Sequence, residues 1–168
     1  MKRMIITDEM IDHAKHEWSP PFKNQYSIAG DDAYWIGNLA EMVFAMTYPE
    51  AIRINNGDSL DDRLNGDFIL KGMKIDVKTK KRTTFVQPDF STSIPARFKN
   101  YKFDWFAFYS YNVKAKVLEW CGWYNREQYF IDGMLIRAGS PFESNRIFNA
   151  GKQYDADQYD LKIKQLIP

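Results

Sequence analysis

Residues 66–82, GDFILKGMKIDVKTKKR, carry charged side chains inside two apolar runs that each have the length of a β-strand. Asp76 and Lys78 are two residues apart, so a strand would point both side chains to the same face. A tight turn between the runs would pair them and bring Asp67 close to Asp76. The segment therefore predicts two carboxylates and one ammonium group close together on a β-hairpin.

These three groups suit a particular chemistry. Two neighbouring carboxylates repel each other unless a cation lies between them, and hard oxygen ligands favour Mg²⁺ or Mn²⁺. A lysine beside such a metal would stabilise negative charge on a phosphate that is attacked by a metal-activated water. A solvated hairpin, in which Asp76 and Lys78 are exposed and pair with each other, explains the same residues. The spacing alone favours neither interpretation.

A β-sheet is expected around this hairpin. Short runs rich in β-branched and aromatic residues, separated by turn residues, predict strands in residues 51–54, 66–72, 73–79, 103–111 and 116–124. Residues 82–102 contain two prolines and have no clear period, which predicts a long loop with a short helix in it. Loops of this length inside a compact domain are commonly functional.

Helices are predicted before and after these strands in the sequence. Thr7 is expected to cap a helix over residues 7–18, and a second helix is expected from Gly30 to Pro49. A capped helix over residues 125–135 and a last strand or helix near residues 159–166 follow. The second helix has an apolar stripe that must pack inward, formed by Ile36, Leu39, Ala40, Val43, Phe44 and Thr47.

Length and composition predict a single α/β domain over residues 1–168. The chain is 45% hydrophobic and 16% aromatic, which is enough to bury a full core without disulfides or metals. Cys121 is the only cysteine, lies in an apolar run and is expected to be a core thiol. No apolar N-terminal run suggests a signal peptide or a membrane span, so a cytoplasmic protein with no membrane partner is expected.

The net charge of +1 gives the whole molecule no bias toward nucleic acids or membranes. The charge is nevertheless unevenly distributed, because residues 71–82 contain six basic side chains and only one acid, Asp76. Such a run is either a solvated face or a contact surface for nucleic acid. His13 and His16 lack acidic or cysteine neighbours in a ligand pattern, so both are expected to be exposed rather than metal ligands.

The order of these features resembles the PD-(D/E)XK nuclease superfamily. Its signature is an Asp, a hairpin-length spacer and an Asp-x-Lys triplet, which are Asp67, FILKGMKI and Asp76-Val77-Lys78 here. The family also places an acidic residue on a helix before the sheet, and WIGNLAEMVF supplies Glu41. The similarity covers residues 34–124 and is greatest to small, stand-alone members encoded by phages and other mobile elements. Gly66 replaces the family's proline, and Asp76 replaces the commoner Glu.

The resemblance implies a restriction-endonuclease-like fold, with a mixed central β-sheet flanked by helices, and Mg²⁺- or Mn²⁺-dependent hydrolysis of DNA. It assigns the metal to Asp67, Asp76, the main-chain carbonyl of Val77 and Glu41. It also assigns Lys78 to positioning the attacking water and stabilising the pentavalent phosphate. Glu41 lies beside the apolar stripe between small neighbours, which leaves it room to reach the sheet, although a lone Glu on a helix is more commonly a surface residue.

The expected DNA contacts follow the catalytic triplet. Lys80, Lys81 and Arg82 would meet backbone phosphates, and Gln87 and Arg97 would reach the nucleic acid from the long loop. Phe85 and Phe90 would stack on bases, or else pack under the loop. Symmetric cleavage of both DNA strands would require a homodimer.

Two other functions fit the sequence. One is a nuclease fold that binds DNA without cleaving it, although such a protein has no reason to keep buried carboxylates beside phosphates. The other is an unrelated α/β protein that binds a partner, which the near-neutral charge and the five tryptophans favour. A metal titration separates this last alternative from the nuclease fold.

Overall fold

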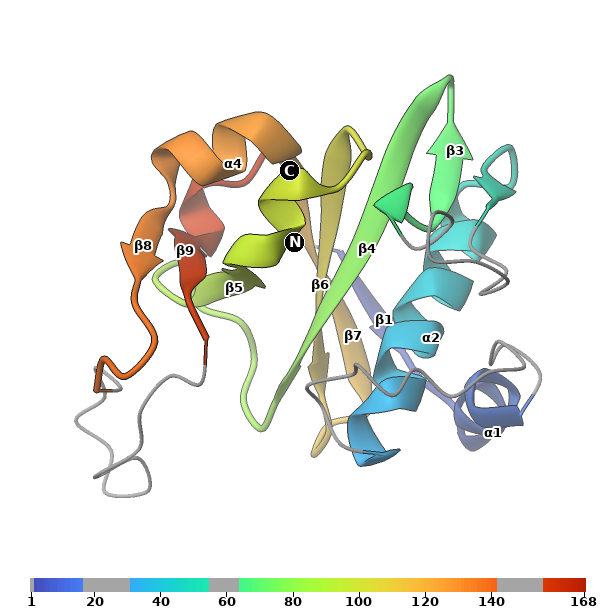
Figure 1. Cartoon of the computed structure of the whole chain (residues 1–168). Coiled ribbons are helices and arrows are strands. Elements are labelled where there is room, and N and C mark those ends of the chain that lie inside the picture. Colours follow the sequence, from blue (N-terminus) through green and yellow to red (C-terminus); the bar gives the residue numbers. More distant parts are fainter. Residues whose placement is uncertain (1, 17–30, 55–63, 142–155) are drawn as a thin grey trace.

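A six-stranded mixed sheet forms the centre of the computed structural model, which describes residues 2–16, 31–54, 64–141 and 156–168 (Figure 1). The strand order is β1-β7-β6-β4-β3-β2. β4 and β6 run parallel, and the other neighbouring strands run antiparallel. The strands are β1 Arg3–Ile5, β2 Ile52–Arg53, β3 Phe68–Leu70, β4 Met73–Arg82, β6 Trp105–Asn112 and β7 Val117–Asn125.

Different layers cover the two faces of this sheet. Helices α1 (Asp8–His16) and α2 (Asp31–Thr47) lie on one face. The other face carries a small antiparallel sheet in the order β5-β9-β8, together with α4 and two 3₁₀ helices. These elements are β5 Ser91–Pro95, η1 Ala96–Asn100, α4 Arg126–Asp132, β8 Met134–Ile136, β9 Gln158–Lys162 and η3 Ile163–Gln165. The α/β class with a mixed sheet is confirmed, and the second face holds strands as well as helices.

Strand alternation divides the apolar residues into two cores. Ala107, Tyr109 and Tyr111 of β6 pack in the core under α1 and α2, whereas Phe106 and Phe108 pack in the core under the small sheet. β4 follows the same alternation in register with β6. Ile75 and Val77 join the first core, and Asp76, Lys78, Lys80 and Arg82 face the small sheet.

Most predicted helices form as expected, although α4 ends at Asp132 and residues 134–135 of the predicted helix belong to β8. Thr7 caps α1 by accepting a hydrogen bond from the Met10 amide at 3.2 Å, and the Asn125 side chain caps α4 in the same way. The predicted inward stripe of α2 is buried except for Thr47, which is exposed. Thr47 lies in the last turn, where its hydroxyl donates to the Val43 carbonyl at 2.7 Å, so it needs no buried partner. Residues 17 and 18 of the predicted first helix lie outside the described residues.

The five predicted strands are present, but three others were not predicted. β4 continues through the basic run to Arg82, and the segment predicted as a loop contains β5 as well as the expected short helix. β5 pairs with β9, about seventy residues later in the chain, and β1 pairs with β7. β8 also pairs with β9. Such distant pairing leaves no local sequence pattern. Among the described helices, none is long and apolar enough to cross a membrane.

Two glycines shape the hairpin of β3 and β4. Lys71 and Gly72 form its two-residue turn, with φ of 51° and 80°, as a type I′ turn requires. Gly66 has φ of 86°, and a Cβ there would lie 2.8 Å from the Ile75 carbonyl oxygen. Proline is restricted to φ near −65°. A proline therefore cannot occupy this backbone, which explains the glycine beside Asp67.

We expect Gly66→Ala to lower the free energy of unfolding by about 2–4 kcal/mol, because it adds both φ strain and overlap with the Ile75 carbonyl. Gly72→Ala is the matched control, since it has a similar φ but no atom within 4 Å of the added Cβ. It should cost only about 1–2 kcal/mol. Chemical denaturation of both variants measures the difference, and equal losses would show that the close contact at Gly66 does not constrain the fold.

Candidate functional site

The structure brings Glu41, Asp67, Asp76 and Lys78 close enough to interact electrostatically, although they come from three segments. Asp67 immediately precedes β3, Asp76 and Lys78 lie on β4, and Glu41 lies on α2. The charge of Asp67 acts on both other carboxyl groups, and Lys78 is influenced by all three. The predicted grouping of these side chains is thus present.

Asp67 is held across the hairpin by main-chain hydrogen bonds. Its amide donates to the Ile75 carbonyl at 2.8 Å, and its own carbonyl accepts from the Ile54 amide at 2.9 Å. Its carboxylate Oδ2 accepts from the Val77 amide at 2.7 Å. The buried carboxylate is therefore fixed against the middle of β4, next to Asp76.

Asp76 and Lys78 form a close ion pair on the face of β4 that is turned toward the small sheet. Lys78 Nζ lies 2.5 Å from Asp76 Oδ2, and this close contact favours the charged form of both groups. The Lys78 ammonium also lies 4.5 Å from the centre of the Phe98 ring of η1. Asp76 is only 4% exposed, so the alternative interpretation is wrong about solvation, although the pairing that it predicted is present.

Glu41 reaches toward the sheet as predicted, and the surface alternative is wrong. Its side chain is 16% exposed, and its Oε2 accepts a hydrogen bond from Arg53 Nη2 of β2 at 3.1 Å. Sequence reasoning missed Arg53, whose only signal was a charge inside the short apolar run of residues 51–54. It also missed Phe98, which resembles every other aromatic residue of its segment.

Burial dominates the titration of the carboxyl groups. Burial raises the pKa of Glu41 to about 8, with a further rise from Asp67 that Arg53 and Lys78 partly offset. Burial also raises the pKa of Asp76 to about 7, where Lys78 lowers it and Asp67 raises it. For Lys78, burial opposes the charged form, but the three carboxylates outweigh it and raise its pKa.

The donor chemistry fits a divalent cation. When all groups are ionised, the three carboxylates outnumber the two nearby cations, Lys78 and Arg53. Within the described ranges, no three His, Cys, Asp or Glu side chains meet closely enough to hold a metal ion. Glu41 is turned to Arg53 instead, and Lys78 stands against Asp76. Val77 has its side chain in the first core, so only its main chain faces the site.

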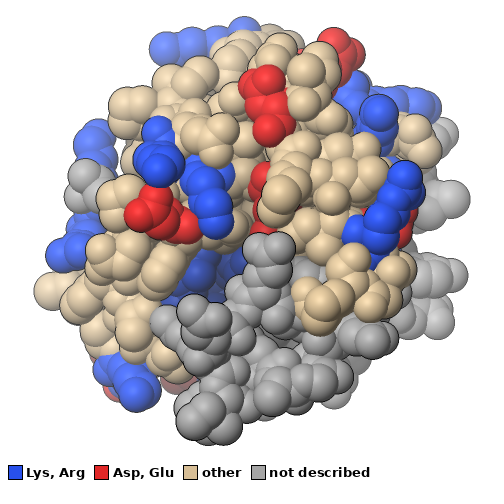
Figure 2. All heavy atoms as spheres, turned by 90° about the vertical axis from the view of Figure 1, so that its left-hand side faces the viewer, with Lys and Arg blue, Asp and Glu red and all other residues tan. Residues whose placement is uncertain are grey.

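The predicted DNA-contacting run is divided between two faces. Lys80 and Arg82 share the face of Lys78: Lys80 Nζ donates to Ser93 Oγ at 2.8 Å, and Arg82 Nη2 donates to the Ser91 carbonyl at 2.8 Å. Lys81 points to the opposite face and lines a groove beside α1. Figure 2 shows basic and acidic side chains around a hollow on the side of the molecule that carries the small sheet.

The predicted loop residues lie at the surface. Gln87 and Arg97 are exposed, and the Arg97 guanidinium lies 5.6 Å from the centre of the Phe98 ring. Phe90 packs against the second core, as the packing alternative predicted. Phe85 is 39% exposed and lies beneath the Arg3 guanidinium. Arg97 therefore lies near Lys78 through their shared aromatic neighbour.

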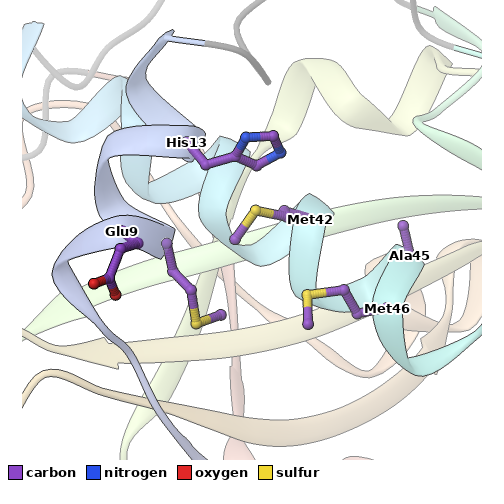
Figure 3. Close-up of a pocket in the computed structure, with 6 residues that line it drawn as sticks. Glu9, His13, Met42, Ala45 and Met46 are labelled. Carbon is purple, nitrogen blue, oxygen red and sulfur yellow. The ribbon is translucent and has the colours of Figure 1, made fainter.

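The remaining candidates lie apart from this group. Cys121 is buried, and burial raises the pKa of its thiol. His16 is exposed as predicted, but His13 is half-buried, because it lines an apolar groove of about 470 Å³ between α1 and α2 (Figure 3). Met42 and Met46 line the same groove, on the face of the sheet opposite Lys78.

Comparison with known protein families, with curated proteins and with solved structures finds no match.

We expect Asp76→Asn to flatten the pH dependence of stability in the metal-free protein. With a pKa of about 7 instead of 3.8, folded Asp76 keeps a proton that the unfolded chain releases, so wild-type stability falls as pH rises between these values. The amide cannot titrate. Denaturation midpoints from pH 4 to 8 should show the variant equal to or more stable than wild type at pH 8. A less stable variant at pH 8 would identify Asp76 as half of a structural ion pair.

Proposed function

We propose that this protein is a divalent-metal-dependent deoxyribonuclease of the PD-(D/E)XK superfamily, with a restriction-endonuclease-like fold. One observation carries the proposal: Asp76 is buried beside Lys78, and the fold adds Asp67 and Glu41 from two other segments. Isolated buried carboxylates are costly unless a cation or a function keeps them. The order of helix, hairpin and parallel β4–β6 pair supports the assignment.

The metal ligands would be Asp67, Asp76, the main-chain carbonyl of Val77 and Glu41, with Mg²⁺ or Mn²⁺ favoured by an all-oxygen donor set. When bound, the ion would lower the pKa of a coordinated water and offset negative charge on the phosphate. Arg53 neutralises Glu41 in the metal-free protein. Metal binding would therefore release Glu41 from this ion pair.

Lys78 would hold the attacking water and stabilise the charge that develops on the pentavalent phosphate. Asp76 and the Phe98 ring fix the position of its ammonium group, and the Lys78 side chain is 27% exposed. Lys80, Arg82, Gln87 and Arg97 would contact the DNA backbone from the same side of the sheet. Lys81 is on the opposite face and would lie outside this contact.

A second candidate is a nuclease fold that binds DNA without cleaving it. The observation in its favour is that both Glu41 and Asp76 already have cationic partners, Arg53 and Lys78, without a metal. Such pairs can persist in a protein that never binds a metal. Incubation of supercoiled, linear and branched DNA with the protein and Mg²⁺ or Mn²⁺ separates the two candidates, because only the enzyme cuts.

We expect Lys78→Ala to lower the rate of DNA cleavage by about a hundredfold or more while the fold is kept, because one charge that stabilises the transition state is lost. Lys114→Ala is a matched control, since it removes one exposed positive charge from the turn between β6 and β7. Single-turnover cleavage of a labelled DNA measures both variants. Wild-type rates in Lys78→Ala would remove this lysine from the mechanism.

We also expect Mg²⁺ or Mn²⁺ to raise the thermal midpoint of the wild-type protein, as any ligand selective for the native state must. Because the ligand carboxylates must be ionised, the rise should be larger at pH 8 than at pH 6. Asp76→Asn should abolish the response and the cleavage, whereas Asp89→Asn, at an exposed ion pair with Lys164, should retain both. If neither Mg²⁺ nor Mn²⁺ changes the thermal midpoint of the wild-type protein, the result contradicts the metal site.

A further inference from the structure

Three cationic side chains from two different sheets converge on Ser91 of β5. Arg82 Nη2 donates to the Ser91 carbonyl at 2.8 Å, and Lys80 Nζ lies 3.4 Å from the same oxygen. Lys162 Nζ, from the neighbouring strand β9, lies 3.1 Å from Ser91 Oγ. Lys80 also donates to Ser93 Oγ. The cluster thus spans the junction between β4 and the small sheet.

The charge of this cluster is not balanced. In the described part of the chain, none of the three cations forms an ion pair. Glu119 acts on Arg82 but is itself paired with Arg3, and Asp160 is the acid that acts on Lys80. The Asp160 carboxylate accepts a hydrogen bond from the Gln158 side chain instead. Burial, together with repulsion from Arg82 and Lys162, lowers the pKa of Lys80 to about 8, although part of the side chain is exposed.

Two buried donors near the cluster also lack partners. Arg82 Nε and Ser110 Oγ have no hydrogen bond to any described residue. Ser110 lies opposite Lys80 in the parallel ladder of β4 and β6, so it is on the same face of the sheet. Three cations and two unused donors on one side of the sheet are suited to an anion with several acceptor oxygens.

We propose that Lys80, Arg82 and Lys162 form a subsite for a phosphate of the nucleic-acid backbone. This phosphate would be the neighbour, along the same strand, of the phosphate that is cleaved at Lys78. Lys80 follows Lys78 by two residues on one strand face, which separates them by roughly 6–7 Å. This separation is similar to that of successive phosphates along one nucleic-acid strand. The inference rests on the proposed function, and it places the bound strand along β4 with its backbone between β4 and the small sheet.

Lys162→Gln and its matched control Lys164→Gln test the subsite. Both remove one exposed lysine charge from the same end of the chain, but Lys164 pairs with Asp89, away from the Ser91 contacts. Binding of a labelled oligonucleotide is measured by fluorescence anisotropy over a range of salt concentrations. Both substitutions are placed in an Asp76→Asn background, which prevents cleavage. Lys162→Gln should reduce the slope of log affinity against log salt by about one unit, and Lys164→Gln should not.

Neutral methylphosphonate linkages, placed singly along the oligonucleotide, test the position of the phosphate. When the neutral linkage replaces the phosphate that Lys162 contacts, Lys162→Gln should no longer weaken binding of the oligonucleotide. This linkage should be next to the one at which Lys78→Gln no longer weakens binding. Equal behaviour of the Lys162 and Lys164 variants, with DNA binding intact, would overturn the subsite and leave the nuclease proposal standing. Absence of oligonucleotide binding in the Asp76→Asn protein would instead refute the proposed function. If the cluster binds inorganic phosphate but not the oligonucleotide, it is a site for a free anion, and the nucleic-acid subsite is overturned.

Discussion

The central position of β4 is the constraint on which the other features depend. β4 pairs with β3 on one side and with β6 on the other, and layers cover both faces of the sheet. The middle of a strand in this position is buried whatever side chains its sequence places there. Ile75 and Val77 pack under α2, so the alternation forces Asp76 and Lys78 into the opposite side. Burial of charge is therefore a consequence of sheet position, and it creates the need for the surrounding partners.

Those partners come from elements that contact β4 only in the folded chain. Asp67 is anchored by the Val77 amide, and the Phe98 ring of η1 holds the Lys78 ammonium. Because the Asp67 carboxylate raises the pKa of both Glu41 and Asp76, the group behaves as one electrostatic unit. Lys78 and Arg53 neutralise part of this charge in the metal-free protein. A divalent ion would complete the balance, which links the stability of the fold to the proposed chemistry.

The small sheet lies against the partly exposed end of β4. β5 and β9 bring Ser91 and Lys162 to the end of β4, where Lys80 and Arg82 lie. The charged face of one strand therefore continues from buried carboxylates to a cationic cluster. The protein has a net charge of only +1, so its overall composition produces no strong electrostatic field. The separation of acidic and basic side chains along β4 produces a local electrostatic field instead.

Turn residues and local periodicity are enough to predict the hairpin, the face shared by Asp76 and Lys78, and the helix that carries Glu41. Other features depend on contacts that form only in the folded chain. Arg53 meets Glu41, and Phe98 meets Lys78, through contacts between segments far apart in the chain. The strands β1, β5 and β8 also form only with distant partners. Lys81 does not belong to the basic cluster, because β4 continues as a strand to Arg82 and side chains on a strand alternate between its two faces.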